Sequence, residues 1–112
     1  MNIIITVITP DPELCLDLVA GNAPDSFVTV SDGVRLKYEN TRSVSALSAE
    51  QFAADIITFV LERCDDIAIG ILASWLYDIL KGRKADLHIG DDDEVVISPE
   101  AIRQALMKEK NK

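Results

Sequence analysis

The chain has 112 residues, of which 48% are apolar and 27% charged, so we exclude a disordered chain and expect one domain over residues 1–112. Nineteen acidic and eleven basic residues give a net charge of −8. A general nucleic-acid-binding function and attraction to anionic lipid are therefore excluded, because both need an excess of basic side chains.

The N-terminal segment predicts a strand over residues 2–9, because isoleucine, valine and threonine dominate it. The first basic residue in the sequence is Arg35. The segment therefore lacks the positive start of a secretory signal, and we expect a cytoplasmic protein.

A short helix and a hairpin are expected next. Asp11 can cap the helix and Pro12 suits its first position, although a strand over residues 14–20 is the alternative. Residues 27–30 and 34–39 flank a glycine-containing turn, and the second of these segments alternates apolar and polar side chains. This pattern predicts an antiparallel hairpin with one buried face.

A loop over residues 40–45 is expected to lead into a longer helix. Ser48 and Gln51 fit a capping box, in which two side chains satisfy the end N–H groups of a helix. The following apolar residues have helical spacing: Phe52, Ala53, Ile56, Ile57, Val60, Leu61 and Cys64. We therefore predict a helix over residues 48–64.

The next predicted helix, over about residues 67–81, is apolar nearly all round. Such a helix is either central in the core or covered by a partner. Gly70 and Ser74, four residues apart, would let another backbone approach closely, and Trp75 is a large anchor. We predict that a partner contacts four residues of this helix: Ile71, Ser74, Trp75 and Asp78.

A second hairpin is predicted over residues 85–89 and 94–98. Ser98 and Pro99 have the character of a helix start, and the end of this closing helix, residues 107–112, is expected to be a frayed tail. The predicted order is β-α-ββ-αα-ββ-α. It corresponds to a single two-layer α+β domain with antiparallel hairpins packed on a central apolar helix.

Side chains that could catalyse a reaction or bind a metal have simpler structural roles. The acidic run 91–94 lacks the spacing of a calcium loop and suits a solvated turn. His88 is the only histidine, and we expect it to face solvent on a strand. Asp65 and Asp66 favour a helix N-terminus over acid–base chemistry. We predict no catalytic residue, no metal site and no cofactor.

The two cysteines, Cys15 and Cys64, have no CxxC spacing and lie among apolar neighbours. We expect buried free thiols in a reducing compartment, with a disulfide bridge or a reactive thiol as the alternative.

The acidic residues are unevenly distributed along the chain. Residues 1–80 hold 12 acids and 4 bases, whereas residues 81–112 hold 7 of each. An acidic face steers association with a basic partner and can imitate a nucleic-acid backbone. One function consistent with this is an acidic inhibitor of the immunity, anti-restriction or anti-CRISPR type, which blocks a basic nucleic-acid-binding surface. Solubility alone is the simpler interpretation.

The segment 67–106 has a distinctive order of motifs. An apolar helix carrying Trp75-Leu76 ends in the basic Lys81-Gly82-Arg83-Lys84, and a hairpin then leads to Ser98-Pro99-Glu100 and a closing helix. This order resembles the effector-associated constant-component domains of bacterial conflict systems. The resemblance covers about a third of the chain and implies a non-enzymatic adaptor. The turn here is rich in aspartate where an Asp-Gly pair is expected, and no functional residue is carried over.

We therefore expect a non-enzymatic protein-interaction protein, adaptor or regulatory, of bacterial or phage origin. It would bind a protein partner or a second copy of itself through the apolar helix, and a homodimer is one expected form. Direct nucleic-acid binding and membrane association are not expected.

Overall fold

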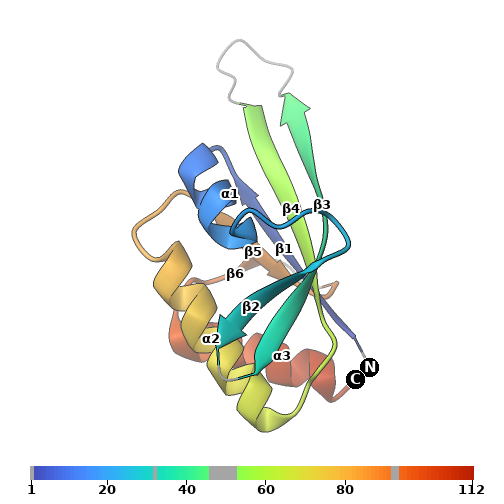
Figure 1. Cartoon of the computed structure of the whole chain (residues 1–112). Coiled ribbons are helices and arrows are strands. Elements are labelled where there is room, and N and C mark those ends of the chain that lie inside the picture. Colours follow the sequence, from blue (N-terminus) through green and yellow to red (C-terminus); the bar gives the residue numbers. More distant parts are fainter. Residues whose placement is uncertain (1, 32, 46–52, 92–93) are drawn as a thin grey trace.

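The computed structural model of the protein describes residues 2–31, 33–45, 53–91 and 94–112. These residues form six strands and three helices (Figure 1). The elements in chain order are β1 (Ile3–Thr9), α1 (Pro12–Val19), β2 (Phe27–Ser31), β3 (Val34–Ser45), β4 (Ala53–Leu61), α2 (Asp66–Leu80), β5 (Asp86–Ile89), β6 (Glu94–Val95) and α3 (Pro99–Lys110).

The strands of the described chain form one antiparallel sheet with the order β2-β3-β4-β1-β5-β6. At its centre, β1 pairs with β4 along its whole length, from Ile3 opposite Leu61 to Thr9 opposite Asp55. The pairs β2–β3 and β5–β6 are hairpins at the two edges. The predicted α+β class with antiparallel hairpins is confirmed.

Alternate residues of the strands point into the hydrophobic core. On β1, Ile5 and Val7 are fully buried. Ile4, which precedes Ile5, points to the opposite face and is 49% exposed. The helices contribute side chains to the same core: Leu14, Leu18, Leu72, Leu76, Ile102 and Leu106. The helices and one face of the sheet therefore share a single core.

Each helix begins at a side-chain cap. The capping oxygen accepts a hydrogen bond from a backbone N–H two or three residues later, at 2.9 Å for Asp11, 2.8 Å for Asp65 and 3.1 Å for Ser98. Proline occupies the first turn of α1 and of α3. The predicted starts of these helices are confirmed, and the alternative of a strand over residues 14–20 is wrong.

The prediction of a helix over residues 48–64 is wrong, because residues 53–61 form β4. Side chains of β4 enter the core with the period of a strand: Ile57, Phe59 and Leu61. Apolar residues also lie on the other face of this central strand, so the same sequence fits a helical spacing. Hydrogen-bonded pairing with β3 and β1 stabilises the strand instead of the helix. The predicted capping box at 48–51 lies outside the described residues.

Three further boundaries differ from the prediction. Residues 40–45 are part of β3 instead of a loop, because they pair with β4. The return strand β6 is limited to Glu94–Val95 instead of 94–98. Helix α3 continues through Lys110, well into the tail expected at 107–112, and packs on α2. The observed order is β-α-βββ-α-ββ-α.

Candidate interaction site on helix α2

Helix α2 has a core side and an apolar outer ridge. The core side is formed by Ala68, Ile69, Leu72, Ala73, Leu76 and Leu80. The outer side carries Ile67, which is 68% exposed, and the partly buried Ile71 and Trp75 at intervals of four residues. We call these three side chains the α2 ridge. No helix among the described residues is long and apolar enough to cross a membrane.

A groove of about 480 Å³ lies between α2 and the edge strand β2. We call it the α2–β2 groove. Its lining comes from both elements: Val30, Ser31, Gly70, Ile71, Ser74, Trp75 and Asp78. The volume is in the range that holds a bound side chain or small ligand. All four residues predicted to contact a partner thus lie together in one groove.

Gly70 leaves open space in this groove. A Cβ atom added at Gly70 would meet no atom within 4 Å beyond its chain neighbours and its own helix backbone. Glycine inside a helix destabilises the fold by about 0.5–1 kcal/mol relative to alanine. The close backbone approach predicted at Gly70 is therefore not made by any described part of this chain. The space is accessible to another molecule.

Asp78 adds a negative charge to the groove. Its Oδ1 atom lies 3.7 Å from Nζ of Lys81, and the two side chains are 65% and 57% exposed. Lys81 Nζ also lies 5.6 Å from the ring centroid of Tyr77. An ion pair this exposed contributes little to stability. Asp78 can therefore exchange its contact with Lys81 for a cationic group of a ligand with little loss of free energy.

The histidine candidate, His88, lies on β5, and Glu94 of the acidic run 91–94 lies on β6, whereas residues 92–93 of that run lie outside the described residues. His88 pairs with Thr6 on one side and Glu94 on the other, and it points away from the buried Leu87. A hydrogen bond with Asp86 and the charge of that carboxylate raise the pKa of Glu94. Among the described residues, no three His, Cys, Asp or Glu side chains form a set that could hold a metal ion.

Neither cysteine is in a disulfide, and both thiols are partly buried where they pack against the predicted apolar surroundings. Burial, together with a hydrogen bond to Asp55, raises the pKa of Cys15 to about 12. Burial also raises the pKa of Cys64. Cys15 contacts the first part of β4 and Cys64 follows the end of that strand, so the thiols are too far apart for a disulfide.

Sequence reasoning found the helical wall of the groove but missed the strand wall. The sequence predicts a hairpin that contains Val30 and Ser31 but gives no sign of a site there. Their position beside α2 depends on β2 being the edge strand of the sheet. Strand order is a tertiary property, and the sequence carried no local signal for it.

Comparisons of the chain with protein-family models, with curated proteins and with solved structures find no significant match. The resemblance of residues 67–106 to effector-associated constant-component domains therefore stays a prediction.

Proposed function

We propose that the protein is a non-enzymatic interaction domain that holds an apolar side chain of a partner protein in the α2–β2 groove. The observation that carries the proposal is the open space at Gly70 beside Ile71 and Trp75. This arrangement leaves apolar side chains exposed to water and places a glycine, a poor helix former, inside α2. Binding of a partner side chain in the space would offset both unfavourable free-energy terms.

The groove favours insertion of a side chain over addition of a regular strand. An edge strand such as β2 offers free backbone groups to a peptide. The pairing of β2 with β3, however, is irregular between Thr29 and Ser31, where Val30 enters the groove. Such a bulge twists an edge strand away from continuous pairing. The expected ligand is an aliphatic or aromatic side chain with a lysine or arginine nearby to reach Asp78.

The groove chemistry supports binding without catalysis. Among its described lining residues, Asp78 is the only ionisable side chain, and it pairs with Lys81. The lining brings no histidine, lysine or cysteine to Ser31 or Ser74, and its one carboxylate, Asp78, is exposed and paired with Lys81. Burial of one large apolar side chain contributes about 1.5–3 kcal/mol, so the groove provides an anchor within a larger contact.

The test is affinity purification of the tagged protein from its native cells, in wild-type and groove-blocked forms. Gly70→Met places a flexible apolar side chain in the open space and replaces glycine with a better helix former. Gln104→Met is the matched control, because it puts the same side chain on an exposed position of α3. A partner present in stoichiometric amount should copurify with wild type and with Gln104→Met.

Loss of that partner in Gly70→Met alone supports the groove as the binding site. Retention of the partner by Gly70→Met, with the fold intact by circular dichroism, contradicts the proposal. Recovery of the protein with no partner in any form also contradicts it.

The net charge of −8 supports a second candidate, an acidic inhibitor that covers a basic nucleic-acid-binding surface. Several acids of the described chain are already paired with bases, including Asp17 with Arg83 at 2.8 Å and Asp66 with Lys110 at 2.5 Å. An electrostatic complex should dissociate as salt rises, whereas contact through the groove should persist. Partner release between about 0.1 and 0.5 M salt would favour the inhibitor.

A further inference from the structure

The sheet has a second face, opposite the core, that is largely apolar on its two central strands. Ile4 opposite Val60 and Ile8 opposite Ile56 form two apolar rows, and Thr6 opposite Thr58 forms the row between them. Ile4 is 49% exposed, Ile8, Ile56 and Val60 are partly exposed, and none of these four belongs to the core cluster. An antiparallel sheet that faces water on one side normally carries polar residues there. We call this surface the open face.

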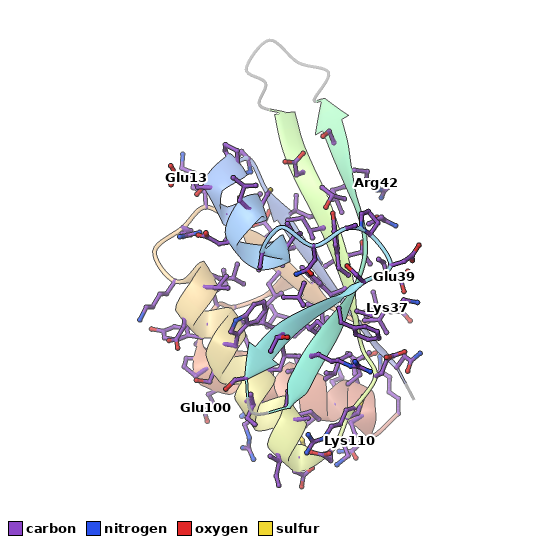
Figure 2. All side chains as sticks on the ribbon, viewed as in Figure 1. Glu13, Lys37, Glu39, Arg42, Glu100 and Lys110 are labelled. Atoms are coloured by element: carbon purple, nitrogen blue, oxygen red, sulfur yellow. The ribbon has the colours of Figure 1, made fainter. Side chains whose placement is uncertain are left out.

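The two flanks of the open face carry opposite charges. On the β3 side, Arg35, Lys37 and Arg42 outnumber the single acid Glu39. Lys37 and Arg42 project away from α1 and α2 (Figure 2).

On the other flank, β5 and β6 present Asp86, His88 and Glu94, with no lysine or arginine in either strand. The largely apolar centre thus separates the basic strand β3 from the acidic strands β5 and β6, and Arg83 and Lys84 lie just before β5, beside Ile8 and Asp86.

The strand register places one residue of each flank in the same row across the sheet. Arg42 pairs with Ile56, Ile56 with Ile8, and Ile8 with Asp86. The row therefore reads basic, apolar, apolar, acidic over β3, β4, β1 and β5. Its midpoint lies between β4 and β1, which is also the midpoint of the strand order.

This row is self-complementary under one particular two-fold rotation. If the axis runs parallel to the strands above the line between β4 and β1, Arg42 of one copy lies over Asp86 of the second copy. Ile56 then lies over Ile8 of the second copy. A two-fold axis perpendicular to the strands would instead stack the basic flanks on each other. The charges therefore select the first arrangement.

From this register we infer that the open face binds a second copy of the chain, with the two sheets packed face to face about an axis parallel to the strands. The size of the face is sufficient for a weak dimer. Six strands at a spacing of about 4.8 Å and a height of roughly 20 Å give on the order of 500 Å² per copy, near the lower limit of specific interfaces. The α2–β2 groove stays accessible, because α2 packs on the other face.

Sedimentation velocity of the purified protein, from low micromolar to millimolar concentration in low salt, tests the inference. The wild type should form dimers as concentration rises. Arg42→Glu and Asp86→Arg should each weaken dimerisation by at least about tenfold, because like charges then face each other twice in the symmetric pair. Arg103→Glu, on the exposed side of α3, makes the same charge change away from the face and should dimerise as wild type does.

Two further samples distinguish charge pairing from a general loss of stability. An equimolar mixture of Arg42→Glu and Asp86→Arg should form a heterodimer, because both contacts between unlike charges are restored. The double variant Arg42→Glu/Asp86→Arg should again dimerise with itself. A wild type that stays monomeric throughout, or single variants that dimerise as wild type does, would overturn the inference. Dimerisation that is weakened by Gly70→Met and not by Arg42→Glu would also overturn the inference. The groove is tested separately, because Arg42→Glu should still copurify with the partner proposed for the groove.

Discussion

The Cys15 thiol on α1 donates a hydrogen bond to the Asp55 carboxylate on β4, with 3.3 Å between Sγ and Oδ2. The other oxygen of Asp55 accepts a hydrogen bond from the Ser43 hydroxyl on β3, at 2.7 Å. One carboxylate therefore connects a helix to the two strands of the longest hairpin. Burial of the Cys15 thiol, together with this contact, raises its pKa and keeps the thiol protonated.

Cys15 should react slowly with thiol reagents at pH 8, because its pKa of about 12 leaves almost no thiolate. The rate of its alkylation should rise about tenfold per pH unit up to that pKa. Asp55→Asn removes the carboxylate charge, so the pKa should fall and alkylation at pH 8 should accelerate. Mass spectrometry of the labelled peptide measures both rates. Equal reactivity of Cys15 before and after Asp55→Asn would contradict the assigned cause.

Glu94 should titrate above the usual range of a glutamate, because it shares a hydrogen bond with the Asp86 carboxylate. Asp86→Asn removes the neighbouring charge, and the pKa of Glu94 should then fall. Carboxyl carbon shifts recorded by NMR across an acid titration follow this group directly. Asp25→Asn, outside β5 and β6, is the control and should leave the Glu94 titration unchanged. An unchanged Glu94 curve in Asp86→Asn would refute the pairing.

Gly70→Ala should stabilise the protein by about 0.5–1 kcal/mol, because alanine is a better helix former and its Cβ has free space. Gly90→Ala should do the opposite. Gly90 has a φ of +65°, and an added Cβ would meet the Glu109 carboxylate. Urea unfolding of the two variants against wild type gives both signs. A destabilised Gly70→Ala protein would show that the space at Gly70 is occupied within the monomer.

Leu14 and Leu16, both on α1, offer a matched test of the core. Leu14 is fully buried and Leu16 is 66% exposed. Leu14→Ala should destabilise the fold by about 2–5 kcal/mol, whereas Leu16→Ala should change the free energy of unfolding by less than about 0.5 kcal/mol. Thermal and urea unfolding measure both values. Similar losses for the two variants would mean that α1 is packed differently.

Local chemistry in the sequence identified the helices correctly at their starts. Asp11 and Ser98 act at short range, through hydrogen bonds to their own helix turn, and the predicted caps are confirmed. Asp65 behaves in the same way on α2. Contacts made within one helical turn can be inferred from residue spacing alone.

The strand β4 could not be assigned by spacing, because a central strand with two apolar faces has no alternation for sequence reasoning to detect. Ile56 and Ile57 are adjacent and point to opposite faces, one to the open face and one to the core. The β-branched run at 56–58 was the available signal for a strand. The helical spacing of the apolar residues around this run favours the wrong element.

The sequence predicts only the α2 side of the groove, for a similar reason. Ile71 and Trp75 are predictable from sequence, because an all-apolar helix must be covered by the rest of the fold or by a partner. Val30 joins them only through the strand order, which places β2 at the edge of the sheet beside α2. The charge row from Arg42 to Asp86 likewise depends on register across four strands. Such relationships exist only once the sheet is assembled.

The most direct test of the central claim is site-specific photo-crosslinking in native cells, with a benzophenone side chain at position 74 in the groove or at position 104 on the outer side of α3. We expect one dominant crosslinked partner from position 74, lost when Gly70→Met is added, and no comparable product from position 104. Equal products from both positions, or a position-74 product that survives Gly70→Met, would contradict the account.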